Sequence, residues 1–265
     1  MDFKYSEEQQ MLTESLRRLG KYVWSFEQRR QRQAKAELDS QAWQQLAELG
    51  VLGLTIPEEF DGFGESPASL LAIHLELGRS LVAEPVISSS VHSSAILRAS
   101  HSTQAQQLLP QLASGEAVCS VALRETGRVD DVADVKTQAT KNVEGYVVTG
   151  SKQAVSWGAQ ANYLVVSANL DGQLALFLVP ADAAGVQRTD YPTMDGMRCA
   201  TVSLEQVAVS AEALLATGDQ AVDILRNAEQ EATVALCAQT VGMMEQLLAI
   251  TIEYLKTRQD RKSVV

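Results

Sequence analysis

The sequence predicts an α+β protein in which a β-domain lies between two helical segments. From Val118 to Ala168, short runs rich in Val, Thr and aromatic residues are separated by Gly, Asn and Asp. This pattern is typical of successive antiparallel strands. Before that stretch, and again after about Asp219, apolar residues recur at helical spacing. A chain of 265 residues can also bury a substantial core.

Composition narrows the classes of partner. Hydrophobic residues make up 46% and charged residues 21% of the chain, as in ordinary globular proteins. The formal net charge of −11 argues against non-specific nucleic-acid binding, which needs clustered Lys and Arg, but it leaves a phosphate-bearing small ligand open. The N-terminus lacks the apolar core of a signal peptide, and no run approaches a membrane span. We therefore expect a soluble, cytoplasmic protein that does not bind membranes.

Metal and disulfide chemistry are not expected. The cysteines are odd in number and far apart, so we expect them to be reduced and structural. The histidines lie on helical patterns without the spacing of metal ligands. These residues are Cys119, Cys199, Cys237, His74, His92 and His101.

The N-terminal third reads as a series of helices. Ser6 and Gln9 form a capping-box pattern that opens a first helix, which we expect to reach about Lys35 as a charged surface face. A second helix starts near Asp39 and stops at Gly50, where glycine ends it. Further helices are expected from Pro67 onward, over 87–99 and over 104–112.

The rest of the chain completes three predicted domains. Strands continue to about Val209, with turns at glycine and proline residues. From Asp219 an amphipathic pattern predicts a helix that ends at Arg258. We expect an N-terminal helical domain over 1–116, a β-domain over 117–212, the start of a C-terminal helical domain over 213–259, and a tail over 260–265.

Four short motifs, taken with this element order, resemble the acyl-CoA dehydrogenase family over residues 1 to about 259. They are Leu49-Gly-Val-Leu-Gly-Leu, Pro57-Glu-Glu-Phe-Asp-Gly-Phe-Gly, Gly150-Ser-Lys and Tyr254-Leu-Lys-Thr-Arg-Gln. Within the family the chain looks most like the small subunit of pimeloyl-CoA dehydrogenase. That narrower likeness rests on Leu81-Val-Ala-Glu-Pro, Asp131-Val-Ala-Asp-Val, Tyr191-Pro-Thr-Met-Asp-Gly and Ala235-Leu-Cys-Ala-Gln-Thr-Val-Gly.

The resemblance implies a fold and a chemistry. The fold would be the acyl-CoA dehydrogenase type, with an all-α N-terminal domain, an antiparallel β-domain and the first helix of an incomplete α-bundle. The cofactor would be FAD, which takes a hydride from the β-carbon of an acyl-CoA thioester while a carboxylate removes the α-proton. The implied partners are a larger homologous subunit or a second copy of the chain, and an electron-transfer acceptor.

The family's flavin signature is altered here. Its Thr-Glu-Pro-Gly-Ala-Gly-Ser-Asp aligns with residues 124–131, so that Glu125, Gly127 and Asp131 are retained. Arg124 replaces the Thr that bonds the flavin edge, and Asp130 replaces the Ser that faces the pyrophosphate. A carboxylate beside a pyrophosphate is repulsive unless Arg124 or Arg128 compensates. The candidate cofactor-binding residues are Leu123, Arg124, Gly127, Asp130, Ser156 and Arg258.

A second signature, Trp-Ile-Thr, aligns with Ala154-Val155-Ser156, so the hydroxyl is kept and the Trp that covers the flavin is lost. Trp157 would point to the opposite face if the strand is regular. Two interpretations follow. Either the flavin site has altered chemistry, or the site is degraded and the chain is a structural partner that completes another subunit's site.

Two positions on the last helix bear on catalysis. Arg258 matches the family's Arg that reaches the FAD of the neighbouring subunit, although it could simply be a cation at a helix C-terminus. Glu231 lies one residue before the position where some members carry the catalytic Glu, which is Ala232 here. One residue is about 100° around a helix, so Glu231 is a weak candidate. We expect the base beyond residue 265.

The chain's last six residues depart from the family. Where relatives continue with Phe-Gly and further helices, this sequence gives Asp260-Arg-Lys-Ser-Val-Val, which resembles a translated sequencing adapter. We expect a non-native tail on a truncated gene product, with a real deletion as the alternative. Truncation would expose the apolar side of the last helix, so we expect this chain to be marginally stable and inactive alone.

Overall fold

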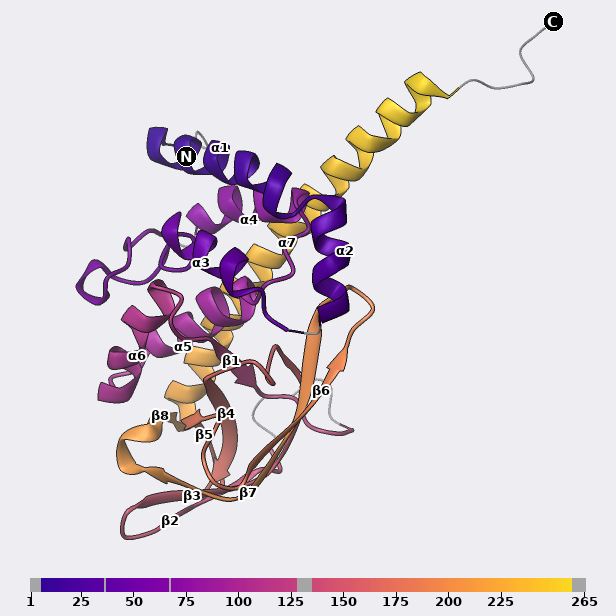
Figure 1. Ribbon diagram of the computed structural model, residues 1–265. Coiled ribbons are helices and arrows are strands. Elements are labelled where there is room, and N and C mark those ends of the chain that lie inside the picture. The colour runs from indigo at the N-terminus through magenta and orange to yellow at the C-terminus, as the bar shows by residue number, and fades with distance from the viewer. Residues whose placement is uncertain (1–5, 36, 67, 128–134, 259–265) are drawn as a thin grey trace, which may run out of the picture.

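The computed structural model describes residues 6–35, 37–66, 68–127 and 135–258 (Figure 1). Helices form the N-terminal part, a sheet follows, and one long helix ends the described chain, as the sequence predicts. The N-terminal elements are the helices α1 (Glu7–Val23), α2 (Phe26–Lys35), α3 (Ser40–Glu48), α4 (Ser69–Arg79), α5 (Ser94–Ala99) and α6 (Thr103–Ala113), the 3-10 turn η1 (Glu58–Phe60) and the π-helix η2 (Val86–Ser93).

The predicted capping box opens α1. Gln9 N donates to the Ser6 hydroxyl at 3.1 Å, and Ser6 N donates back to the Gln9 side chain at 3.0 Å. The prediction of one helix to Lys35 is wrong, because the chain breaks between α1 and α2. Trp24 occupies the break, is 3% exposed, and donates from its indole to the Glu84 carboxyl at 2.8 Å. The turn allows this ring to be buried.

The predicted helix over 87–99 is divided into η2 and α5. The first of these is a π-helix, a rare form that occurs frequently at functional sites. Its hydroxyls bind the edge of the first strand: Cys119 N donates to Ser89 Oγ at 3.1 Å, and Ser93 Oγ donates to Cys119 O at 3.0 Å. Hydrogen bonds between serine hydroxyls of η2 and the backbone of β1 therefore join the helical layer to the sheet.

The sheet has eight strands in the order β6-β7-β3-β2-β4-β5-β8, with β1 added beside β4. The expectation of a wholly antiparallel domain is wrong in detail, because β1 and β2 both pair with β4 in parallel. Parallel neighbours require a crossover, which here is the intervening chain. The strands are β1 (Cys119–Ala122), β2 (Gln138–Lys141), β3 (Gly145–Ser156), β4 (Tyr163–Leu170), β5 (Gln173–Pro180), β6 (Val186–Pro192), β7 (Arg198–Ser210) and β8 (Leu214–Thr217).

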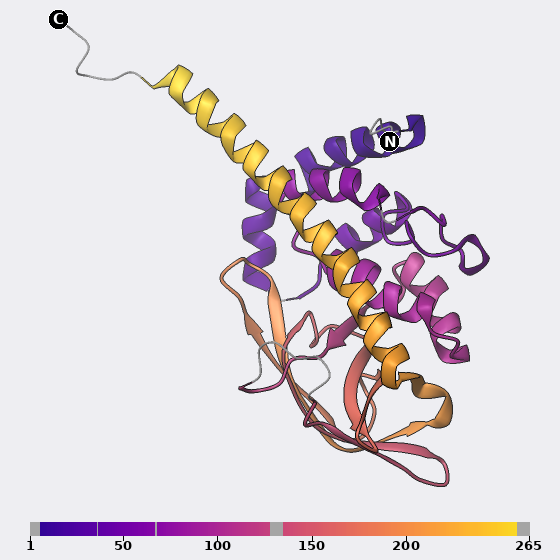
Figure 2. The same ribbon diagram turned by 180° about the vertical axis from the view of Figure 1, so that it is seen from behind.

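The long helix α7 (Gly218–Thr257) crosses the back of the helical layer and then stands clear of it (Figure 2). It packs closely on α4 through two glycines. A Cβ on Gly242 would lie 2.0 Å from Leu75 O, and one on Gly78 would lie 2.0 Å from Gln239 O. The far half of α7 is apolar and exposed, with Leu247 65% and Ile250 56% exposed.

The composition of α7 corrects one expectation from the sequence. By length and apolar content alone, Gly218–Thr257 is long enough to cross a membrane. This is weak support for a membrane span, because helices in the core of other proteins pass the same test. Contacts of α7 with α4, η2 and α5 account for its near half without a membrane.

Candidate functional site

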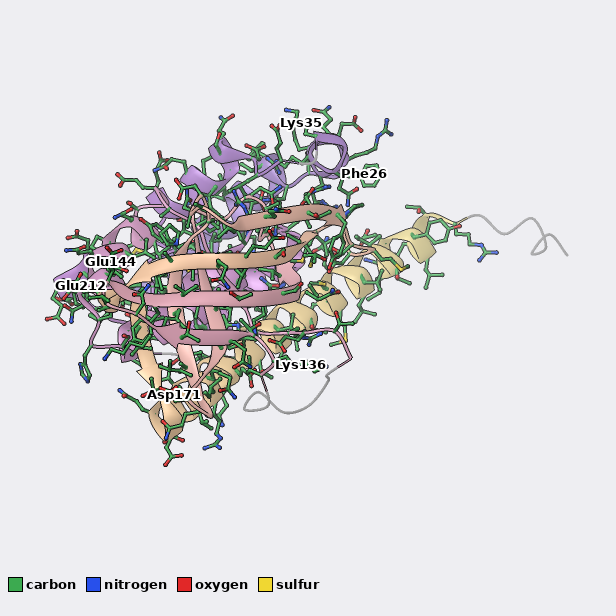
Figure 3. The ribbon with its side chains drawn as sticks, turned by 90° about the horizontal axis from the view of Figure 1, so that it is seen from below. Phe26, Lys35, Lys136, Glu144, Asp171 and Glu212 are labelled. Atoms are coloured by element: carbon green, nitrogen blue, oxygen red, sulfur yellow. The ribbon has the colours of Figure 1, made fainter. Side chains whose placement is uncertain are left out.

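The predicted cofactor loop leaves the C-terminal end of β1 and lies against β3. Gln153 N donates to Arg124 O at 2.8 Å, which places the loop alongside the strand that ends at Ser156. Figure 3 shows Lys136, just after the loop, at the end of the sheet opposite to Glu144 and Glu212. Asp130, with Arg128 and Asp131, lies outside the described residues.

A buried ion pair fastens this loop. Lys152 has a fully buried side chain, and its Nζ lies 2.7 Å from Glu125 Oε1 and 2.9 Å from Ser167 Oγ. Burial lowers the pKa of Lys152 to about 8, and the Glu125 carboxylate opposes that shift. Burial also pushes the pKa of Glu125 upward, but the bonds from Lys152, Thr137 and two backbone amides outweigh it and hold that pKa at about 2. Both groups are therefore charged at neutral pH.

The end of β3 is irregular, which overturns the assumption behind the predicted place of Trp157. The register with β7 shifts between Lys152 and Val155, and Ala154 adopts a positive φ of 51°. Trp157 follows the strand at φ 55°, is 5% exposed, and donates from its indole to Ala83 O at 3.0 Å. The ring is thus fixed against the segment that precedes η2.

Arg124 and Ser156 lie in one neighbourhood, with Cys199 as the link. Ser156 is the register partner of Cys199 on β7. Burial raises the pKa of the Cys199 thiol, Asp195 and Asp190 raise it further, and the positive charge of Arg124 opposes them. Arg124 is exposed and Ser156 half-buried, and neither side chain has a hydrogen bond or ion pair to another described residue. The Arg124 guanidinium and the Ser156 hydroxyl can therefore both donate hydrogen bonds to a ligand.

The other loop residues are compatible with a ligand that approaches the backbone. Leu123 is half-buried, and its carbonyl accepts from Lys152 Nζ at 3.4 Å. Gly127 has φ 77°, and a Cβ there would meet nothing within 4 Å. Glycine adopts this conformation without strain and lets a ligand come close. Within the described ranges, no group of three or more His, Cys, Asp or Glu could hold a metal ion.

A cleft of about 660 Å³ opens next to Trp157, between α2, the β6–β7 hairpin and α7. The most buried acidic residue that lines this cleft is Glu84, which is 6% exposed. The sequence patterns did not identify Glu84 as a site residue. Burial raises the pKa of this carboxyl, although the Trp24 indole favours its charged form. A glutamate before Pro85 has no helical or strand periodicity that would have marked it.

Comparison with known proteins assigns the family. The acyl-CoA dehydrogenase N-terminal domain matches residues 6–116, and the acyl-CoA dehydrogenase middle domain matches residues 120–207. The chain belongs to the acyl-CoA dehydrogenase family. It is 28% identical over 235 residues to (2S)-methylsuccinyl-CoA dehydrogenase of Cereibacter sphaeroides, covering 81% of this chain and 43% of that protein. It is 27% identical over 271 residues to the probable acyl-CoA dehydrogenase YngJ of Bacillus subtilis. That match covers 98% of this chain and 71% of that protein.

Solved structures agree. The ChsE4–ChsE5 complex from Mycobacterium tuberculosis aligns with TM-score 0.87 and 28% identity, over 99% of this chain and 70% of that chain. An acyl-CoA dehydrogenase complexed with FAD from Bacillus anthracis aligns with TM-score 0.88 and 26% identity, over 98% of this chain and 46% of that chain. The chain spans about half the length of the first curated relatives it matches, 43% of one and 54% of the next.

Acyl-CoA dehydrogenases bind FAD, and most of the site described above fits such a group. Among the described residues, Arg124 and Ser156 have side chains without a hydrogen-bond or ion-pair partner, and Gly127 leaves its backbone open to a ligand. Ala154 is the misfit, because it offers no ring to cover a flavin. These residues would bond the edge of the flavin and leave one of its faces less protected than an aromatic residue would.

The two predicted residues on α7 are not brought to this site. Arg258 is exposed at the far end of the helix, well away from the sheet (Figure 1). Glu231 lies 2.5 Å from the Arg98 guanidinium on α5, and both side chains are about one-fifth exposed (19% and 20%). Its carboxylate is therefore already paired, and its role as a base stays a prediction.

Proposed function

We propose that this chain is the small subunit of a hetero-oligomeric, FAD-dependent acyl-CoA dehydrogenase that oxidises the α,β-bond of an acyl-CoA thioester. The observation that carries the proposal is that Arg124 and Ser156, each without a hydrogen bond or ion pair to another described residue, both lie near Cys199: Ser156 is its register partner, and the charge of Arg124 acts on its thiol. FAD, when bound, supplies the hydride acceptor. Arg124 and Ser156 donate hydrogen bonds to its edge, and the Gly127 backbone admits its phosphates.

The proton acceptor is expected from outside the described residues. Glu231 is held by Arg98, and a carboxylate paired with a guanidinium is a weaker base, because the pairing favours its charged form. An acyl-CoA substrate is suggested by the relatives, whose names specify CoA thioesters. The likeness to the pimeloyl-CoA dehydrogenase small subunit extends this to a dicarboxylic acyl group.

A paired assembly is supported by two features. The similar structures include a complex of ChsE4 with ChsE5 and a steroid dehydrogenase named for two proteins, Tcur3481–Tcur3483. Arg258 is the C-cap of α7, whose last turns project from the molecule (Figure 2), and its exposed position supports a contact with a neighbouring subunit. The partner would be a larger homologous subunit or a second copy, and an electron-transfer acceptor would reoxidise the flavin.

A structural subunit without a cofactor is the second candidate. Arg124 in place of a flavin-bonding Thr, and an exposed Ala154 in place of the covering Trp, favour it. Such a chain would complete a site on its partner and hold no flavin itself.

Flavin absorbance separates the two candidates. The purified protein, alone and with the homologous larger subunit, is freed of small molecules, and its visible spectrum is recorded after addition of FAD. A bound-flavin band that weakens in Arg124→Ala and Ser156→Ala supports the dehydrogenase. No flavin band in this chain alone, together with stable assembly in which the band of the complex is unchanged by Arg124→Ala and Ser156→Ala, supports the structural subunit.

A further inference from the structure

A fully buried lysine holds the cofactor loop at two points and is bonded to β4 at a third. Lys152 points from β3 into the sheet, and its Nζ reaches Glu125 Oε1 at 2.7 Å, Ser167 Oγ at 2.9 Å and Leu123 O at 3.4 Å. Glu125 and Leu123 flank Arg124, the residue proposed to meet the flavin edge. The next residue on the strand, Gln153, donates to Arg124 O at 2.8 Å. The ammonium and this amide together fix residues 123–125 on β3.

Glu125 also binds residues 136 and 137, which follow the loop. Its carboxylate accepts from Lys136 N at 2.8 Å, from Thr137 N at 3.0 Å and from the Thr137 hydroxyl at 2.6 Å. The same carboxylate therefore links Lys152 on β3 to the backbone of residues 136 and 137, just before β2.

The buried ion pair between Lys152 and Glu125 is not explained by stability alone. Removing two charges from water is costly, and apolar side chains of similar size often replace a buried pair without loss of stability. Directionality is what the pair adds, because a carboxylate can bind an ammonium, a hydroxyl and two amides at once. The pair joins the start of the loop after β1 to β3, the strand that ends at Ser156.

We propose that Lys152 is a positioning residue for the cofactor: by holding Glu125, it fixes the loop that carries Arg124 and Gly127 relative to Ser156. This inference rests on the proposed flavin site. Neither Lys152 nor Glu125 is expected to touch FAD, since both side chains are almost fully buried, at 0% and 7% exposed. Their effect is on where the groups that bind FAD are held.

The test removes the pair without leaving an unpaired buried charge. The double variant Lys152→Met with Glu125→Leu is compared with Arg226→Met with Asp223→Leu, which removes an exposed ion pair on α7 that is 62% and 67% exposed. Amide hydrogen exchange at residues 136 and 137 is measured without cofactor. FAD affinity and the visible circular dichroism of bound flavin are measured on the full chain with its partner subunit.

We expect the Lys152 and Glu125 double variant to melt like the wild type, to exchange the two amides at least tenfold faster, and to bind FAD at least tenfold more weakly with an altered dichroism band. The control should match the wild type in each measurement. Unchanged exchange, or wild-type FAD affinity with an unchanged band, overturns the inference. If the double variant does not fold, Glu125→Gln, which keeps the side chain's size, is measured in the same way.

The two proposals fail separately. If the wild-type assembly binds no FAD, the proposed function is wrong, and amide exchange alone then decides whether Lys152 holds the loop. If the wild type binds FAD and the double variant binds it equally well, the function stands and the positioning role is wrong.

Discussion

Gly242→Ala should loosen the crossing of α4 and α7. The added Cβ would lie 2.0 Å from Leu75 O and 3.0 Å from Arg79 N, whereas ordinary contacts begin near 3.4 Å. The helices must therefore separate locally by about 1.4 Å, the difference between 3.4 and 2.0 Å. Buried side chains at the crossing, such as Leu77 at 1% exposed, would lose contacts.

The magnitude follows from two opposing effects. Overpacking of this kind costs about 1–3 kcal/mol and can cost more when backbone atoms clash. Alanine in place of glycine in a helix returns about 1 kcal/mol. Because the clash here is with backbone atoms, the cost lies at the upper end, about 3 kcal/mol, and we expect a net loss of about 2 kcal/mol in the free energy of unfolding, with no local effect on the flavin site.

Urea unfolding followed by circular dichroism measures this change, because the midpoint shifts with stability when the slope is constant. Thr240→Ala is the matched control, since Thr240 is exposed two residues earlier and its hydroxyl bonds only Leu236 O, at 2.8 Å. It should lie within about 0.5 kcal/mol of the wild type. A Gly242→Ala protein as stable as the wild type would refute the close-packing argument.

Three further predictions follow from the site and its surroundings. The pKa of Glu125 is held at about 2, below its usual 4.5, so the unfolded chain takes up this proton first as the pH falls, and the stabilisation is lost between pH 4.5 and 2. Urea unfolding at several pH values should show a smaller loss in Glu125→Gln. Trp24→Phe removes the only indole donor to buried Glu84 and should cost about 1–3 kcal/mol, which a thermal melt would show. Ser156→Ala should weaken FAD binding about tenfold, the equivalent of one hydrogen bond. An unchanged affinity would mean that Ser156 makes no hydrogen bond to FAD.

Element order was accessible from the sequence because it depends on local periodicity. The Ser6 cap, the start of α3 and the full length of α7 all follow from spacing and capping residues. The parallel pairing of β1 with β4 was not accessible, since it joins residues more than forty positions apart along the chain, such as Cys119 and Tyr163. The left-handed Ala154 also has no sequence signal, because alanine rarely adopts that conformation.

For the site, the resemblance located the loop and Ser156, while periodicity alone located neither. The ion pair between Lys152 and Glu125 was missed, although each residue stood in a quoted motif. Pairing across 27 positions depends on how β3 and the loop come together in space. The strand neighbours of Lys152 are the polar residues Ser151 and Gln153, so no periodicity marked this lysine as buried.

The hydroxyls of Ser89 and Ser93 have a consequence for how the protein can be divided. They bind the backbone of Cys119 on the side of β1 that faces away from β4, and both are 0% exposed. A fragment beginning at residue 117 would leave this strand edge bare, and bare edges recruit other strands. By covering this edge, η2 protects the sheet from pairing with strands of other molecules. A fragment that retains η2 with β1 keeps this edge covered, and we expect it to aggregate less than one that begins at residue 117.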